Sequence, residues 1–163
     1  MNPLHESPTP QTTMENLIKN QMQPGSETLT SGVIAKMNPR FVACDYKEKT
    51  LELAFDVLDW EQDTNSAINH GILGAAFDST LGLLCRCYVY PHVITTVSLN
   101  TSYYSPVFFG DTFYIKAKIE FQGRSLCNLV AEATLDNQSI HSSADLSMFA
   151  STSAVFKIFK TTA

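Results

Sequence analysis

The segment from Gly71 to Leu84 reads GILGAAFDSTLGLL, and its apolar side chains cover every direction of a helix rather than one stripe. Such a helix must be wrapped by other structure, so the rest of the chain has to form a layer around a helix predicted at 69–87. The only charge in the segment is Asp78. Removing an ionised carboxylate from water is costly unless it is paired or hydrogen-bonded. Asp78 is therefore either a structural residue, bonded to a hydroxyl such as Ser79 or Thr80, or a functional one.

Strand patterns lie on both sides of this helix. Residues 51, 53, 55 and 57 are all apolar, and residues 113–121 alternate in the same way, as expected for a sheet with one solvated face. We predict strands at 41–46, 51–57, 93–104, 111–122, 125–135 and 140–150, turns at Ser105-Pro106, Gly123 and Asp136-Asn137, and an apolar piece at 154–159 that extends an edge or caps the domain. One buried helix with consecutive antiparallel strands predicts an α+β fold, in which the helix packs across a single curved sheet.

The N-terminal region has a different character. Residues 1–13 hold three of the seven prolines and few apolar side chains, so we predict a disordered tail there. A short helix is expected at 14–22, and residues 14–163 are expected to form one domain, as a length of 163 residues favours. A single sheet leaves long edges, and pairing through an edge is a common route to a dimer.

The composition restricts the partners. A formal net charge of −5 and a pI of about 5.2 argue against nucleic acid, which needs a basic face, so an anionic ligand must be held locally. No stretch approaches the ~20 apolar residues of a membrane span, and no secretory signal is visible, so we expect no membrane and a cytoplasmic location. The four cysteines lack zinc-type CxxC spacing, which predicts free, mostly buried thiols and no metal site.

Three motifs stand in a specific order: NHGILGAAFDSTLG at 69–82, TTVSLNTSYYSPVFFGD at 95–111 and FQGRSL at 121–126. Together they resemble the hotdog-fold acyl-CoA thioesterases, in particular the phenylacetic-acid-degradation (PaaI-like) type, over residues 45–150. The resemblance implies a hotdog fold with one long central helix and hydrolysis of an acyl-CoA thioester. It also implies no cofactor apart from the coenzyme A of the substrate, and a homodimer or homotetramer.

The resemblance implies a catalytic set of Asp78, Gly71, Asn69 and Thr96. Asp78 would act as general base or nucleophile, the Gly71 amide would stabilise the oxyanion, and Thr96 would help to hold the attacking water. Because Asp78 follows Gly71 by seven residues, the two lie ~10 Å apart along one helix. The family solves this with a dimer, in which Asp78 faces the helix N-terminus of the other subunit.

The substrate-binding residues implied by the resemblance are His70, Asn65, Gly123 and Arg124. Arg124 matches a position close to the coenzyme A phosphates, and an arginine fork suits a phosphate. Asn65 and Asp63 both lie near the loop position at which the family has an asparagine, and the sequence does not choose between them. Matched without a gap from Asp78, the family's histidine falls on Asn69, with His70-Gly71 where two glycines are usual. A shift by one residue would restore the histidine at His70 but delete a helical residue, so we prefer the ungapped match. Asn69 can cap the helix but cannot take a proton as a histidine can.

Two other functions remain open at this stage. A non-catalytic acyl-CoA-binding hotdog protein is the main alternative, because the family histidine is replaced. A hotdog dehydratase or hydratase would need a histidine base paired with its carboxylate, and the expected motif is not seen.

Overall fold

The computed structural model describes residues 8–26, 29, 31–135 and 148–160 of the chain. Its helices are α1 (Pro10–Gln21), α3 (Gly32–Met37), the 3₁₀ turn η1 (Asp59–Glu61) and the long α4 (His70–Val89). Its strands are β1 (Arg40–Asp45), β2 (Thr50–Asp56), β3 (Val93–Tyr103), β4 (Thr112–Gln122), β5 (Leu126–Leu135) and β6 (Met148–Phe159).

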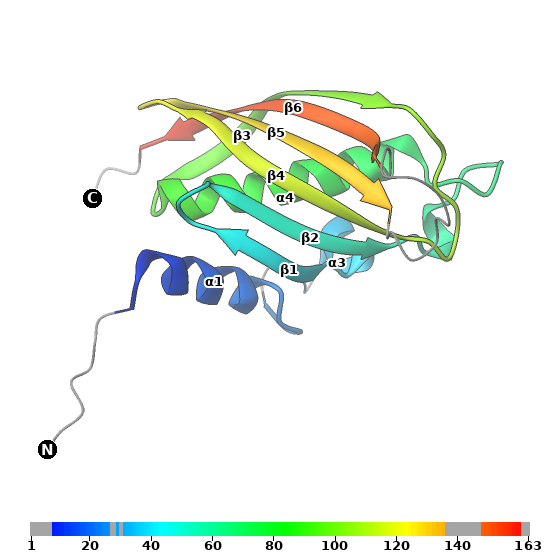
Figure 1. Ribbon diagram of the computed structural model, residues 1–163, viewed down its shortest axis with the longest axis horizontal. Helices are drawn as coiled ribbons and strands as arrows, with labels where there is room; N and C mark the ends of the chain where they lie inside the picture. Colours follow the sequence, from blue (N-terminus) through cyan, green and yellow to red (C-terminus); the bar gives the residue numbers. More distant parts are fainter. Residues whose placement is uncertain (1–7, 27–28, 30, 136–147, 161–163) are drawn as a thin grey trace, which may run out of the picture.

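The strands form one antiparallel sheet in the order β1-β2-β4-β5-β6-β3, which curves over α4 (Figure 1). The predicted α+β fold, with one long helix wrapped by a curved antiparallel sheet, is confirmed. The order contains a crossover, since β3 follows α4 in the chain but pairs with β6 at the far edge. Hydrophobic alternation fixes which face of a strand is buried but not which strand lies beside it, so the sequence pattern alone did not reveal this order.

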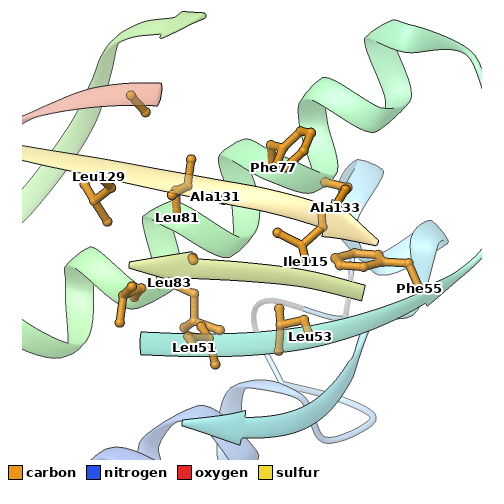
Figure 2. Packing of buried hydrophobic residues seen from close by; sticks show 14 of the residues in the cluster. Leu51, Leu53, Phe55, Phe77, Leu81, Leu83, Ile115, Leu129, Ala131 and Ala133 are labelled. Carbon is orange, nitrogen blue, oxygen red and sulfur yellow. The ribbon is translucent and has the colours of Figure 1, made fainter. Parts of the chain in front are cut away.

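The core lies between α4 and the inner face of the sheet (Figure 2). β2, β4 and β5 point every second side chain at the helix, and α4 presents Phe77 and Leu81, both with no exposed surface. Truncating a buried leucine such as Leu81 to alanine typically costs about 2–5 kcal/mol, because the cavity adds to the lost burial. The packing of α4 therefore fixes the position of any functional side chain on it.

The membrane prediction needs a correction on one point. We expected no stretch long enough to span a bilayer, but α4 has 20 residues and a mean hydropathy of 1.3 over an 18-residue window, which is enough by length and composition. In the described structure 56% of that window is buried under the sheet. The core helix of a globular protein passes the same test, so this is weak evidence for a membrane span.

The predicted tail is wrong for its last residues, since helix α1 begins at Pro10 rather than at residue 14. Thr9 caps the helix by accepting a hydrogen bond from the amide of Thr12 at 3.2 Å, and Pro10 occupies the first turn, where its missing N–H costs nothing. A proline-rich composition was interpreted as disorder, although proline at this position favours a helix. Residues 1–7 lie outside the described part of the chain.

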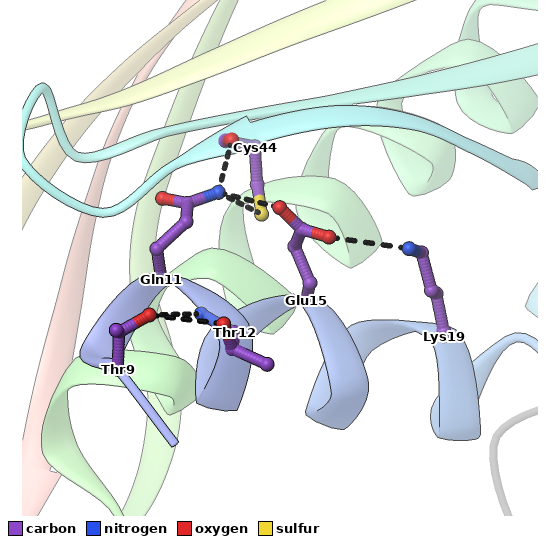
Figure 3. A network of polar contacts seen from close by, with 6 residues as sticks. All are labelled: Thr9, Gln11, Thr12, Glu15, Lys19 and Cys44. Atoms are coloured by element: carbon purple, nitrogen blue, oxygen red, sulfur yellow. Dashed lines mark hydrogen bonds and ion pairs between the residues drawn. The ribbon is translucent and has the colours of Figure 1, made fainter. Parts of the chain in front are cut away.

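Gln11 docks α1 on the edge strand β1. Its Nε2 donates to the carbonyl of Cys44 at 2.8 Å (Figure 3), and its Oε1 accepts from the amide of Tyr46 at 2.7 Å. These backbone groups are of the kind that an additional strand would bond, so α1 covers part of this edge. The opposite edge, β3, carries no such cover in the described residues, and Val97 on it is 60% exposed.

Other elements differ from the predictions in detail. α3 and η1 were not predicted, because both are shorter than the window of roughly 11–18 residues in which helical periodicity can be recognised. β6 runs without a break through residues that we expected to separate a strand at 140–150 from a piece at 154–159. Residues 140–147 and the expected turn at Asp136-Asn137 lie outside the described residues. The cysteines are free thiols, with Cys85 and Cys127 buried and the other two half-buried.

Candidate active site

Asp78 and Thr96 meet across the junction of α4 and β3. The hydroxyl of Thr96 donates to Oδ1 of Asp78 at 2.6 Å. Thr96 stands at a β-bulge, since the register of β3 against β6 shifts between Thr96 and Ser98, and bulges re-aim side chains locally. The hydroxyl of Thr80, considered above as a structural partner of Asp78, instead donates to the carbonyl of Ala76 at 2.9 Å. The bond that holds the carboxylate therefore comes from another element.

The carboxylate of Asp78 is half-buried rather than enclosed, and it lines an open cleft of about 420 Å³. The cleft is lined by one face of α4, by the start of β3 and by single residues of the sheet and the N-terminal region: Leu53, Phe156, Met22, Ser31 and Ile34. Its volume lies in the lower part of the roughly 300–1,000 Å³ range of small-molecule sites. We call it the Asp78 cleft.

The first turn of α4 forms a second group of candidate residues. Asn69 is the N-cap, and its Oδ1 accepts a hydrogen bond from the Gly71 amide at 2.8 Å. The predicted oxyanion donor is thus engaged by the capping side chain. The imidazole of His70 stacks on the ring of Tyr103 with centroids 3.9 Å apart and an interplanar angle of 1°. Tyr103 also donates from its hydroxyl to the carbonyl of His70 at 3.0 Å, which anchors the turn to β3.

The loop before α4 is organised by Asp63 rather than by Asn65. Oδ1 of Asp63 accepts from the amides of Asn65 at 2.7 Å and Ala67 at 3.2 Å, as in an Asx turn. Asn65 is exposed at the tip of this loop. The structure therefore gives Asp63 a local structural role and leaves the substrate-binding role of Asn65 a prediction.

Gly123 and Arg124 lie apart from this region, in the turn between β4 and β5. Nε2 of the neighbouring Gln122 donates to the carbonyl of Tyr88 at 3.5 Å, which places the turn beside the C-terminal end of α4. Arg124 is exposed there and does not line the Asp78 cleft. Within one chain, the structure brings Asp78 and Thr96 together and leaves Gly71 and Arg124 at opposite ends of the helix.

Three further residues lie near the site but were not predicted from the sequence to belong to it. Glu61 is 2% exposed, its carboxylate accepts from the Leu58 amide at 3.0 Å, and its backbone carbonyl accepts from the Asn69 amide at 2.8 Å. Burial raises the pKa of Glu61. Tyr103, at the end of β3, covers the first turn of α4. Arg86 lines the Asp78 cleft, and its spacing of eight residues from Asp78 on one helix is the signal by which the sequence could have indicated it.

A six-stranded antiparallel sheet in this order, wrapped around one long helix that carries a cleft-facing carboxylate, defines a hotdog protein with a candidate hydrolase site. Residues 65–140 match the family model described as the thioesterase superfamily. The resemblance predicted from the motifs is confirmed: the chain has the hotdog fold of the PaaI-like proteins and is similar, over residues 65–140, to the thioesterase superfamily. Among curated proteins, no sequence matches this chain.

Solved structures show the same fold at low sequence identity. The PaaI protein of the Escherichia coli phenylacetic acid degradation operon superposes with a TM-score of 0.74 at 12% identity, over 93% of this chain and 97% of that one. A phenylacetic acid degradation-related protein of Ralstonia eutropha JMP134 gives 0.71 at 20% identity, over 89% and 98%. An acyl-CoA hydrolase of Staphylococcus aureus, solved with butyryl coenzyme A and coenzyme A, gives 0.61 at 16% identity, over 70% and 68%. With the family match, these neighbours support a thioester hydrolase.

Proposed function

We propose that this protein hydrolyses an acyl-CoA thioester to a free acid and coenzyme A, with Asp78 as the catalytic carboxylate. The observation that carries the proposal is the 2.6 Å hydrogen bond from Thr96 to Asp78 at the edge of an open cleft. A carboxylate on a core helix that is held by one hydroxyl and otherwise reaches a cleft is suited to act on a ligand. The acyl-CoA hydrolase neighbour supports the substrate class.

The reaction needs a nucleophile and a donor for the developing oxyanion. In one route Asp78 takes a proton from a water held beside Thr96, and the hydroxide attacks the thioester carbonyl. The carbon–sulfur bond of the tetrahedral intermediate then breaks, and the proton goes to the departing thiolate of coenzyme A. In the other route Asp78 attacks directly, and water hydrolyses the resulting anhydride. Both routes use the same carboxylate, so the present geometry is compatible with either.

The oxyanion donors belong to the first turn of α4, where backbone amides and the positive end of the helix dipole favour a polarised oxygen. The amide of Gly71 donates to Asn69, so the thioester oxygen would share or replace that bond. The amide of His70 is the neighbouring candidate. Because this turn lies ~10 Å along the helix from Asp78, we propose that a second copy supplies it.

The open edge of β3 supports a homodimer of this kind. Gln11 occupies backbone groups of the β1 edge, whereas β3 leaves Val97 60% exposed beside the bulge at Thr96. Pairing of β3 with β3 of a second copy would complete a continuous sheet. It would also bring each Asp78 region to the subunit interface.

The decisive experiment is thiol release from short, long and aromatic acyl-CoAs by the unaltered chain and by Asp78→Asn. We expect the variant to lose at least about a hundredfold in kcat, because the reacting carboxylate is removed, while its thermal unfolding and oligomeric state stay unchanged. Asp45→Asn is the matched control, since this carboxylate lies at the end of β1 and accepts from the Glu48 amide. Full activity of Asp78→Asn across the panel would show that another group performs the chemistry.

A second candidate function is binding of acyl-CoA without turnover. It is favoured by Asn69, which replaces the histidine implied by the resemblance and whose side chain occupies the Gly71 amide. Stabilisation of the protein by a non-hydrolysed acyl-CoA, with no thiol release from any substrate of the panel, would identify this function.

A further inference from the structure

Arg86 lies in the same cleft as Asp78 but two helical turns away. Asp78, Gly82 and Arg86 follow one another at intervals of four residues and line the cleft together. Eight residues correspond to ~12 Å along the helix axis, and side chains on a helix lean toward its N-terminus, here from Arg86 toward Asp78. The cleft therefore has a carboxylate at one end and a guanidinium at the other.

The lining of the cleft combines apolar side chains with the hydroxyls of Ser79, Thr95 and Thr96. Gly82 contributes no side chain to this lining, and a Cβ placed there would meet only the ring of Phe156, at an ordinary 3.6 Å. Packing therefore does not require glycine at this position. Leu83 and Ile94 line the same region. The apolar members of this lining can pack against a short chain of methylene groups.

The guanidinium of Arg86 is exposed and has neither an ion pair nor a hydrogen bond to a carboxylate within the described residues. It is also the only lysine or arginine among the described residues that line the cleft. By contrast, Arg40 forms a two-pronged pair with Asp56. Because the chain carries a formal net charge of −5, its overall field does not attract anions. An anion in this cleft would therefore depend on Arg86.

The position of Arg86 in the last turn of α4 explains why a positive charge is favourable there, but not why the residue is an arginine. A cation near a helix C-terminus is favourable, and lysine would serve equally well. The planar fork of arginine specifically matches a carboxylate through two parallel hydrogen bonds.

We propose that Arg86 selects acyl-CoA substrates whose acyl group ends in a carboxylate, that is, coenzyme A thioesters of dicarboxylic acids. The thioester carbonyl lies at Asp78, the methylene chain fills the apolar part of the cleft, and the distal carboxylate pairs with Arg86. The inference depends on the proposed thioesterase function and specifies the substrate class for that site.

The test compares adipyl-CoA with hexanoyl-CoA, which have the same chain length and differ in the terminal carboxylate. We expect the ratio of their kcat/KM values to be about ten or more in the unaltered chain, because charge-assisted hydrogen bonds are strong. The ratio should fall toward one in Arg86→Gln and be partly kept in Arg86→Lys. Lys47→Gln, which removes an equal charge from the exposed β1–β2 turn, should keep the ratio of the unaltered chain.

The possible failures are distinguishable. If the unaltered chain releases thiol from both substrates at equal rates, the inference about Arg86 is wrong while the proposed hydrolysis stands. If Arg86→Gln lowers both kcat/KM values by the same factor, Arg86 acts on a phosphate of coenzyme A, which also overturns the inference. If no acyl-CoA is hydrolysed at all, the proposed function itself fails. Thermal unfolding of each variant separates a loss of folding from a loss of recognition.

Discussion

Replacing Thr96 with valine tests the geometry of the site most directly, because the two side chains have almost the same shape. The change removes the hydroxyl that donates to Oδ1 of Asp78 at 2.6 Å. That distance is typical of a bond to an ionised carboxylate, and such bonds contribute about 1.5–3 kcal/mol. Thr96 is exposed and Asp78 half-buried, so water compensates for part of the lost hydrogen bond. We therefore expect its removal to cost about 1–1.5 kcal/mol.

If this free energy is lost from the orientation of the Asp78 carboxylate in the transition state, kcat decreases by about five- to tenfold. KM should change little, because Thr96 holds the reacting group rather than the bulk of the substrate. The assay is thiol release with the best acyl-CoA of the panel. Thr96→Ser keeps the hydroxyl and should recover most of the activity.

Thr112→Val provides a matched control for this experiment. The hydroxyl of Thr112 donates to Oδ1 of Asp56 at 2.7 Å, so the same kind of bond is lost at a site away from the cleft. This control should lower thermal stability slightly and leave kcat unchanged. The reasoning is refuted if Thr96→Val retains full kcat, or if valine and serine at position 96 are equally impaired. It is also refuted if the Thr112 control loses as much activity.

The remaining predictions concern folding stability. Burial raises the pKa of Glu61. Its contribution to folding stability is therefore most favourable at a pH below the ordinary pKa of 4.5, and it is lost as the pH rises through the pKa of the folded state. Glu61→Gln should remove this dependence and leave the melting temperature at pH 7 equal or higher, and a clear decrease in thermal melts would contradict it. The Arg40 guanidinium lowers the pKa of Asp56, which stabilises the fold above pH 3.8 and loses its effect as the pH falls below that value. Because both groups are exposed, Asp56→Asn should cost under about 1 kcal/mol in urea unfolding at pH 7 and nothing in strong acid. Gln11→Ala should release α1 from β1, detected as faster amide exchange in α1 with the β2–β6 amides unchanged. Unchanged exchange would show that apolar contacts alone hold the helix.

Much of the architecture follows from side-chain periodicity. The all-round apolarity of α4 requires a wrapping layer, and the alternation in β2 and β4 identifies which residues face it. The helix and strand positions were accordingly predicted to within a few residues for most elements. Short elements such as α3 were missed because six residues hold too little pattern. The start of α1 was missed because the role of a proline depends on whether it stands at the first turn of a helix.

The site was predictable as chemistry but not as geometry. An isolated carboxylate in an apolar helix, such as Asp78, has an energetic cost that is visible in the sequence alone. Its partner Thr96 was suggested by a family resemblance, and the structure brings the two side chains together through a bulge in β3. The engagement of Gly71 by Asn69 could not be foreseen in detail, because it depends on the rotamer of the capping side chain.

By itself, the sequence determined that one apolar helix would be enclosed by an antiparallel sheet and that Asp78 would be the one charge in the apolar part of that helix. Only the tertiary structure decided that β3 crosses to pair with β6, that Tyr103 covers the first turn of α4, and that Arg86 shares a cleft with Asp78. The physical reason is that periodicity specifies the buried face of each element separately. The choice of neighbours depends instead on the packing of all the elements at once, and a functional site is formed where those neighbours meet.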